Sequence, residues 1–311
     1  MRIVIAGASG LIGRALISYF LDMGYRVWAL SRRPERMRKK IPETEKLTWL
    51  CWRNGDSGAW QMALKQSDAV INLMGASILG GRWTKKRKDI LYRSRVDGSR
   101  FLAETIKKHH PGLPVYIQAS AIGYYDNDQP QPVDESGSPG NSFLARLTRD
   151  WEEAAAVLSE SKVTVYFLRL GMVLAPDSLV VRLLKPVFYI YKGGPVGNGR
   201  QIVSWIHIDD VCAICDLLLQ RPFQKRVVNL TAPGAVDMDH FARAFGRAVN
   251  RPSWLRVPAW TVRVLFGEMG RETMLSGIRV SPELLREKSY RFKYADIETA
   301  FRAVVRKKKP S

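Results

Sequence analysis

Three glycines near the start of the chain have the spacing of a phosphate-binding turn. Gly7, Gly10 and Gly13 follow a short apolar run at residues 2–6 and open a segment with helical spacing. Such glycines permit a tight turn, a close approach of the backbone to a pyrophosphate, and close packing of a helix on a strand. The free N–H groups at the start of that helix would bind the phosphates. The intervening residues that we expect to contact the same ligand are Ser9, Leu11 and Ile12.

The end of the second predicted strand indicates the kind of dinucleotide. An acidic residue at this point would bind the ribose hydroxyls of NAD, whereas the chain has Ser31, Arg32 and Arg33. Arginine forms charge-assisted hydrogen bonds with a phosphate and stacks on an adenine ring. We therefore predict NADP as the cofactor, with a solvated arginine pair as the alternative. Three residues at the end of the fourth predicted strand are expected to contact the adenine ribose: Leu73, Met74 and Gly75. Ordinary core packing explains Met74 nearly as well.

Residues for proton chemistry form a less complete pattern. The spacing G-x-x-G-x-x-G points to the short-chain dehydrogenase class, whose members use a Tyr-x-x-x-Lys pair and a serine to transfer protons and orient the substrate. None of the eleven tyrosines has a lysine four residues later. Ser120 does end the fifth predicted strand, and Tyr124 lies four residues further on. Ser120 could hydrogen-bond a substrate oxygen and Tyr124 could donate a proton, while a capping serine and a half-buried structural tyrosine explain them equally well.

Alternating patterns over the first two-thirds of the chain predict an α/β fold. Short β-branched runs alternate with segments of helical spacing, which is typical of a parallel sheet with helices on both faces. Two long helices are expected at 85–108 and 142–160, and the predicted strands are 2–6, 26–30, 47–51, 69–73, 115–119 and 163–168. We therefore predict a Rossmann-type doubly wound parallel sheet with a smaller α/β C-terminal substrate region.

The rest of the chain predicts elements packed against this sheet. The glycine-rich segment 193–200 is expected to be a loop, and no long low-complexity linker follows it. Helices are expected at 209–220 and 237–250, with a short strand at 226–230 between them. The predicted division is a Rossmann domain at 1–175 with returning elements from 203–230, a substrate-cleft region at 176–253, a small C-terminal domain at 254–305 and a basic tail at 306–311.

Sequence blocks along nearly the whole chain match a known family. In order, they are GASGLIG, VINLMGASI, GRWT, SRVDGS, SAIGYY, FLARLTRDWE, LRLGMVLAP, GGPVGNGRQIVSWIHIDDV and VNLT. Together they resemble the epimerase family of NADP-binding proteins of the short-chain dehydrogenase/reductase type, relatives of nucleotide-sugar epimerases with a C-terminal domain of unknown function. The resemblance implies that Ser31 and Arg32, the segment 73–75 and Arg95 line an NADP site, and that Val173 contacts its nicotinamide end.

The same resemblance leaves catalysis open. Aligning the blocks places Phe143 at the usual tyrosine position and Leu147 at the usual lysine position, and neither side chain can transfer a proton. One hypothesis is an NADPH-dependent reductase or epimerase with a non-standard proton donor, acting on an unidentified, nucleotide-sugar-like small molecule. The other is a non-catalytic protein that senses or binds NADP(H). Relatives commonly dimerise through the helices expected at 85–108 and 142–160, which makes a homodimer a further expectation.

Two more sequence segments are expected to line a substrate cleft. The segment 198–200 could bind a phosphate or a sugar hydroxyl, with Trp205 and His207 just beyond it. His207 is an alternative proton donor, but a structural role beside a helix start capped by Asp209 or Asp210 is the stronger interpretation. Three aromatic residues could form a lid over this cleft, and ordinary core packing explains them equally well: Phe188, Tyr189 and Tyr191.

The composition predicts a strongly basic surface. Lys and Arg number 49 against 29 Asp and Glu, a formal net charge of +20. Such a surface attracts phosphate-bearing partners, but no nucleic-acid-binding motif with interleaved aromatic residues is present. Nucleic acid is therefore not an expected partner, although a nucleic-acid-binding relative of the fold stays a second alternative, and a solvated basic surface is favoured.

Cysteine usage and hydropathy point to the cytoplasm. Three cysteines provide no disulfide framework, and Cys212 and Cys215 lie at core-facing positions of an expected helix rather than in a metal site. No apolar run approaches the roughly 18 residues needed to span a bilayer. We expect a cytoplasmic protein without a metal or a membrane partner.

Overall fold

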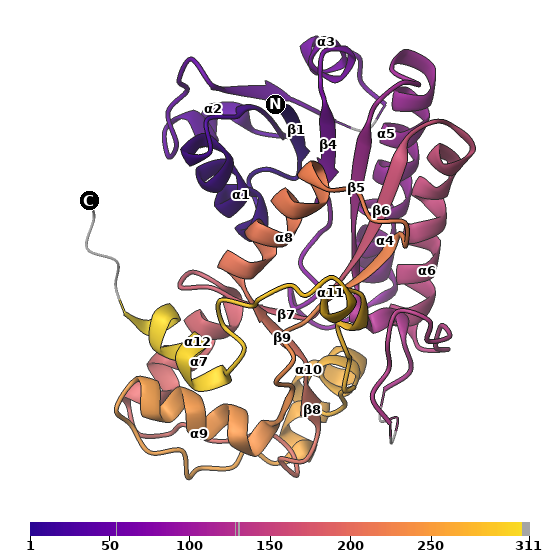
Figure 1. Cartoon of the computed structure of the whole chain (residues 1–311). Coiled ribbons are helices and arrows are strands. Elements are labelled where there is room, and N and C mark those ends of the chain that lie inside the picture. The colour runs from indigo at the N-terminus through magenta and orange to yellow at the C-terminus, as the bar shows by residue number, and fades with distance from the viewer. Residues whose placement is uncertain (54, 128, 130, 307–311) are drawn as a thin grey trace.

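Seven parallel strands form the central sheet in the computed structural model of the chain, which describes residues 1–53, 55–127, 129 and 131–306 (Figure 1). Their order across the sheet is β10-β6-β5-β4-β1-β2-β3. The strands are β1 (Arg2–Ala6), β2 (Arg26–Ser31), β3 (Leu47–Cys51), β4 (Ala69–Asn72), β5 (Val115–Ala121), β6 (Thr164–Leu170) and β10 (Val227–Leu230). The predicted doubly wound parallel sheet is confirmed. Of the predicted basic tail, all but Arg306 lies outside the described residues.

The β-branched runs form strands because both faces of the sheet are buried. Ile3 and Ile5 point to one face and Val4 to the other, and all three are fully buried. Helices α1 (Leu11–Asp22) and α8 (Ile208–Gln220) cover the first face. The second face is covered by α3 (Ala59–Lys65), α5 (Val96–His109) and part of α6 (Phe143–Ala156). Burial on both faces explains why these strands are continuous apolar runs.

The helix predicted at 85–108 is wrong in one respect, because it is two helices. α4 (Lys85–Arg93) ends before Ser94, and α5 begins after Arg95. Ser94 Oγ donates to the Leu91 carbonyl (3.1 Å) and accepts the Ala76 N–H (3.0 Å). Such side-chain bonds to the backbone compete with helical hydrogen bonds and turn the chain here. The helix predicted at 142–160 is α6, capped by Ser142 and followed by a 3₁₀ turn (Val157–Glu160).

The remaining elements gather below the carboxyl edge of the sheet in Figure 1. Two small sheets pair β7 (Met172–Leu174) with β9 (Trp205–His207) and β8 (Ile202–Val203) with β11 (Val236–Asp237). The helices there are α7 (Leu179–Tyr189), α9 (Met238–Ala248), α10 (Ala259–Thr273), α11 (Glu283–Glu287) and α12 (Ile297–Val305). One more short helix, α2 (Pro34–Arg38), connects β2 to β3. The domain boundaries near 175 and 253 stay predictions. No helix in the described part of the chain is long and apolar enough to cross a membrane.

A buried carboxylate joins the C-terminal segment to the sheet domain. Asp210 of α8 accepts the backbone N–H groups of Lys293 (2.8 Å) and Tyr294 (3.1 Å) and the Tyr290 hydroxyl (3.1 Å). Burial raises the pKa of Asp210, and these hydrogen bonds oppose that rise. The three bonds hold the chain that leads into α12 against α8.

Replacing Asp210 with alanine should therefore destabilise the fold. Two backbone N–H groups and one hydroxyl would lose their largely buried acceptor, so we expect the free energy of unfolding in urea to fall by about 3 kcal/mol. The control is Asp209→Ala, because Asp209 is partly exposed: its carboxylate pairs with the exposed Lys293 (2.7 Å) and lies 3.8 Å from His207 Nδ1. That variant should lose less than about 1 kcal/mol. Equal losses in the two variants would contradict the role assigned to Asp210.

Candidate functional site

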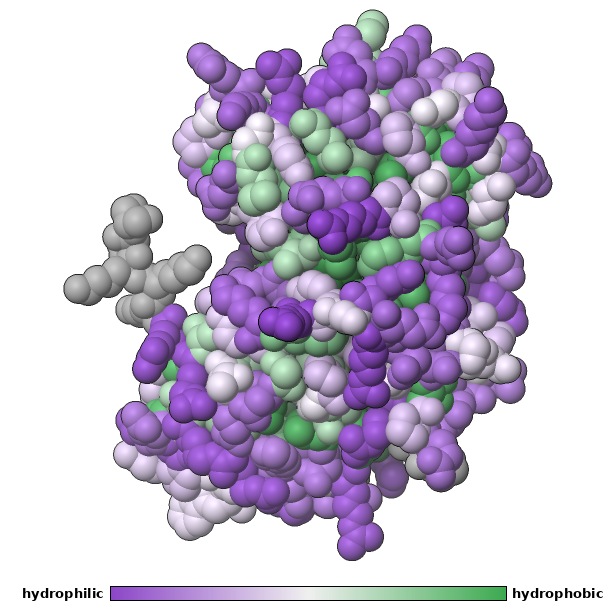
Figure 2. All heavy atoms as spheres, in the orientation of Figure 1, coloured by the Kyte–Doolittle hydropathy of each residue, from purple (hydrophilic) through white to green (hydrophobic). Residues whose placement is uncertain are grey.

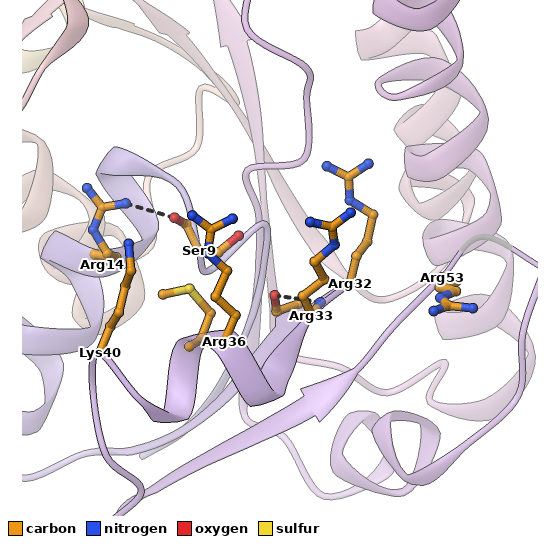
Figure 3. Close-up of a pocket in the computed structure, with 9 residues that line it drawn as sticks. Ser9, Arg14, Arg32, Arg33, Arg36, Lys40 and Arg53 are labelled. Carbon is orange, nitrogen blue, oxygen red and sulfur yellow. Dashed lines mark hydrogen bonds between the residues drawn. The ribbon is translucent and has the colours of Figure 1, made fainter.

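A basic cavity opens at the carboxyl end of β2, beside the glycine loop (Figure 3). Its volume is about 630 Å³, and Ser9, Ser31 and Arg32 of the predicted cofactor site all line it. Ser31 Oγ accepts the Arg33 N–H (3.2 Å), which turns the chain directly after the strand. The cationic side chains that line the cavity are Arg14, Arg32, Arg33, Arg36, Lys40 and Arg53. This concentration of positive charge favours a phosphate-bearing ligand.

The glycine loop is held against the strands on both sides of β1. Gly7 has a φ of +78°, and a Cβ at this position would lie 2.7 Å from the Leu73 carbonyl, so the site requires glycine. The Ala8 N–H donates to the Leu30 carbonyl (3.3 Å) at the end of β2. No described side chain caps α1. Its first N–H groups therefore remain for a ligand that lies across the loop.

A second cavity, the strand-end cavity, lies across the carboxyl ends of β4, β5 and β6. Its volume is about 300 Å³. Leu147, at the predicted lysine position, forms part of its mostly apolar wall, and neither lysine nor tyrosine is among the described residues that line it. The polar side chains there are Arg95, Ser120 and Thr148. The predicted site residues that it brings together are Ile12, Leu73, Met74, Gly75, Arg95 and Ser120.

Arg95 brings an uncompensated positive charge to this cavity. The residue is only 8% exposed, and its guanidinium donates to the carbonyls of Ala76 (3.0 Å) and Leu91 (3.3 Å). No described carboxylate pairs with it. Burial, together with the nearby Arg87, lowers the pKa of Arg95 to about 10. Because a buried cation is costly unless an anion compensates it, Arg95 favours an anionic ligand in the strand-end cavity.

Behind Ser120 lies a buried polar network that the sequence did not reveal. Ser120 Oγ donates to Glu152 of α6, and Arg169 of β6 donates to both Glu152 carboxylate oxygens (2.9 Å each). Arg169 also donates to the Tyr125 hydroxyl (2.9 Å), which donates to Asn229 (2.8 Å). Burial lowers the pKa of Arg169, but its bonds to Glu152 and Tyr125 raise the pKa above the ordinary value. Glu152 thus accepts the hydrogen bond of the Ser120 hydroxyl, which leaves the lone pairs of the serine oxygen free to accept from a group in the cavity.

A third cavity, the C-terminal cavity, shares Gly123 and Leu144 with the strand-end cavity. Its volume is about 180 Å³, and Glu272 is the only charged residue among the described residues that line it. The Glu272 carboxylate accepts the N–H groups of Phe143 (3.4 Å) and Leu144 (3.2 Å) at the start of α6. Gln201 Nε2 donates to two carbonyls, while its buried Oε1 has no described partner. The cavity therefore offers hydrogen-bond acceptors and no cation.

Several predicted site residues lie outside these three cavities. The ring of Tyr124 lies 3.5 Å from the Arg169 guanidinium, and Tyr124 lines none of the cavities. Val173 packs against the core, while Gly171 and Met172 beside it line cavities. In the segment 198–200, Asn198 and Arg200 are exposed. Their ligand contacts stay predictions, as do those of Gly10, Leu11 and Gly13 in the glycine loop.

His207 has a structural position at the start of α8. It is buried, its Nδ1 accepts the Asp209 N–H (3.1 Å), and its ring lies 3.9 Å from that of Tyr294. The helix cap is thus His207 itself rather than Asp209 or Asp210. Burial lowers the pKa of His207 to about 4, so the side chain is neutral at pH 7. His207 also lines neither the strand-end cavity nor the C-terminal cavity.

Most of the chain matches a known family model. Residues 3–231 match the model of the NAD dependent epimerase/dehydratase family. The chain belongs to that family. Residues 257–304 match a second model, a domain of unknown function named DUF1731.

Relatives in the epimerase/dehydratase family align over nearly the whole chain. An epimerase family protein of Mycobacterium tuberculosis is 36% identical over 96% of this chain and 95% of its own length. An SDR39U1 homologue of Arabidopsis thaliana is 30% identical over 98% of this chain and 87% of its own length. The crystal structure of human epimerase family protein SDR39U1 with NADPH has a TM-score of 0.85 at 25% identity, covering 98% of this chain and 99% of that one. The resemblance to the epimerase family is therefore confirmed.

The neutral, buried state of His207 predicts a pH-dependent stability. In the unfolded chain the histidine pKa is about 6.5, so between pH 6.5 and 4 the unfolded state binds a proton that the folded state does not. Lowering the pH through this window should cost about 3 kcal/mol of stability. His207→Asn keeps a helix-capping acceptor and should remove this contribution. Urea unfolding of both proteins across the window measures it, and parallel curves would refute the assignment.

Proposed function

We propose that this protein binds NADP(H) and uses it to reduce or epimerise a small molecule. The observation that carries the proposal is a pair of cavities on either side of the glycine loop. The basic cavity contains Arg32, and the strand-end cavity contains the uncompensated Arg95 and the hydroxyl of Ser120. The basic cavity suits a phosphorylated adenosine. The strand-end cavity provides a cation and a hydroxyl that could contact the reacting group of a substrate. The human relative solved with NADPH supports this assignment.

The residues that line the two cavities suit the phosphate groups of NADP(H). Ser31 and Arg32 would hold the 2′-phosphate in the basic cavity, with the surrounding cations adding to the attraction. The open N–H groups of α1 would bind the pyrophosphate, and Arg95 would supply the compensating positive charge nearby. The segment 73–75 and Ile12 would form the wall between the two halves.

The proton chemistry falls to Ser120 and Glu152. Bound NADPH supplies a hydride to a carbonyl carbon, and NADP⁺ takes one up from an alcohol carbon. For alcohol oxidation, the Ser120 oxygen takes the substrate hydroxyl proton while the Ser120 proton passes to Glu152, and reduction reverses both transfers. Arg169 positions Glu152 through its two hydrogen bonds. Ser120 and Glu152 would thus transfer the proton that Phe143 and Leu147 cannot. We prefer this pair to Tyr124 as the proton donor, because the Tyr124 ring faces Arg169.

The C-terminal cavity favours a small uncharged substrate over a nucleotide sugar. A diphosphate needs cations, and none of the described residues that line this cavity is Lys or Arg. Its 180 Å³ volume is also below the roughly 300 Å³ at which pockets for larger ligands begin. The acceptors Gln201 and Glu272 suit hydroxyl or amine donors. We therefore infer a compact hydroxyl-bearing carbonyl compound or the corresponding alcohol.

A non-catalytic NADP(H)-binding protein is the second candidate. The observation in its favour is the apolar wall at the usual proton-transfer positions, where Leu147 is buried and Phe143 contacts Trp83. Tight NADPH binding without oxidation of NADPH by any compound in a broad carbonyl panel would support this candidate over the enzyme.

Arg32→Ala should weaken NADPH binding much more than NADH binding. The variant removes a charge-assisted contact to the 2′-phosphate, which NADH lacks, so we expect a roughly 10- to 100-fold loss of NADPH affinity. Arg26→Ala is the control, because Arg26 is an exposed residue at the opposite end of the same strand. Calorimetric titration with both cofactors measures the effect. Equal losses for NADPH and NADH in Arg32→Ala would refute the NADP assignment.

Glu152→Gln should lower turnover without weakening NADPH binding. The amide cannot accept the Ser120 proton, so we expect kcat to fall about 100-fold and the pH dependence of kcat to change. Ser120→Ala, a smaller change, should lower kcat similarly. Glu153→Gln is the control, since Glu153 is exposed on the same helix. NADPH oxidation against a panel of small carbonyl compounds provides the assay, with melting temperatures as a check on folding. Unchanged kcat in Ser120→Ala would contradict the mechanism.

A further inference from the structure

Exposed apolar side chains gather in two segments of the C-terminal half. Isolated surface hydrophobic residues are ordinary, whereas contiguous groups mark interaction sites. Among the described residues, exposed large hydrophobic side chains outside these segments are few: Met1, Met23, Met62, Ile90 and Tyr92. Those inside the segments are Leu179, Leu183, Val187, Tyr189, Ile190, Tyr191, Trp254, Leu255, Trp260, Val264 and Leu265. By contrast, hydrophilic residues dominate the face of the molecule in Figure 2.

Backbone and side-chain contacts join the two segments. The N–H groups of Trp254 and Leu255 both donate to the Gly193 carbonyl (3.1 Å each), and Trp254 Nε1 donates to the Tyr191 carbonyl (2.8 Å). The Arg251 guanidinium lies 4.9 Å from the centre of the Tyr191 ring. The end of α7 and the segment before α10 are therefore neighbours, and we name segments 179–191 and 254–265 together the apolar surface.

Helix α7 has an outer apolar face that the described residues leave exposed. Val181 and Phe188 bury one face of the helix in the core of the C-terminal elements. On the outer face, helical spacing places Leu179, Leu183 and Val187 in an exposed row, with Leu183 58% exposed. A helix that is apolar on both faces normally has both faces covered. In the part of the chain that the structure describes, only one of them is covered.

The charged residues of the apolar surface and of the residues next to it in the chain are all positive. Segments 178–208 and 250–267 contain no Asp or Glu. Arg256 pairs with Asp239 from outside these segments (2.8 Å). The cations there that make no ion pair with any described residue are Arg182, Lys185, Lys192, Arg200, Arg251 and Arg263. A second copy of the chain packed on this surface would oppose cations to cations, which is unfavourable. The complementary partner must be both apolar and anionic.

We propose that the apolar surface docks peripherally on an anionic phospholipid bilayer. Tryptophan and tyrosine favour the bilayer interface, where the exposed Trp254, Trp260 and Tyr191 would lie. The aliphatic row on α7 would enter the boundary with the acyl chains, and the unpaired cations would bind the anionic headgroups. The expectation of no membrane partner rested on the absence of a spanning segment, and did not address a surface of this kind. The inference is independent of the proposed function.

Vesicle binding tests the proposal with the full-length protein. The probes are vesicles of phosphatidylcholine alone and vesicles with about 30% phosphatidylglycerol, an anionic lipid content that should attract the cations. We expect sedimentation with the anionic vesicles only, together with a blue shift of tryptophan emission, because Trp254 (73% exposed) and Trp260 (66% exposed) would leave water. A Trp254→Ser, Trp260→Ser double variant should bind at least tenfold more weakly and lose the shift. Met62→Ser is the control, since Met62 is 58% exposed on α3, outside the apolar surface.

Each other outcome overturns the proposal. Absence of binding to either vesicle, or equal binding to both, would refute an anionic bilayer as the partner. Binding that the double tryptophan variant retains would show a general cationic attraction without docking of this surface. A lipid-independent dimer in analytical ultracentrifugation that the double variant abolishes would instead assign the surface to a second copy. Melting temperatures of the variants distinguish all these results from unfolding.

Discussion

The common direction of the strands in the central sheet is the constraint on which the site depends. Because all seven strands are parallel, the carboxyl ends of β1, β2, β4, β5 and β6 share one edge. β1 lies between β2 and β4, although β4 comes later in the chain, and this reversal of strand order opens a crevice. Gly7 fits against Leu73 only because it has no side chain. That contact places the glycine loop between Arg32 on one side and Arg95 and Ser120 on the other.

Compensated and uncompensated charges separate structural from ligand-binding positions. Arg169 and Glu152 are both largely buried, but they pair through two hydrogen bonds, so each satisfies the other. Arg95 is also buried, but among the described residues it donates hydrogen bonds only to carbonyls and lies over the Trp151 ring, with no carboxylate partner. The same contrast applies to the surface, where many cations pair with carboxylates while those around the basic cavity and the apolar surface largely do not. Part of the net charge of +20 therefore lies where an anionic partner would bind.

Local patterns predicted the elements well and their interruptions poorly. The strand at 47–51 has the predicted bounds, because a buried parallel strand is a continuous apolar run. The helical spacing across 85–108 did not indicate the break, because it depends on a bond from Ser94 to Ala76 in another part of the chain. Glu152 had a recognisable signal, since it continues the helical spacing of Leu144 and Thr148, both of which line a cavity. Arg169 had one too, as a lone charge in an apolar strand.

The sequence by itself determined the glycine turn, the strand runs and the basic end of β2. These depend on backbone freedom, on side-chain size and on neighbours a few residues away, which a local pattern contains. Tertiary structure alone decided that Glu152 accepts a hydrogen bond from Ser120, that Glu272 borders the C-terminal cavity, and that α7 exposes a second apolar face. These features join residues far apart in the chain, or depend on which surfaces remain uncovered after packing. Burial and pairing of that kind follow from the order of the strands in the sheet, which no local spacing specifies.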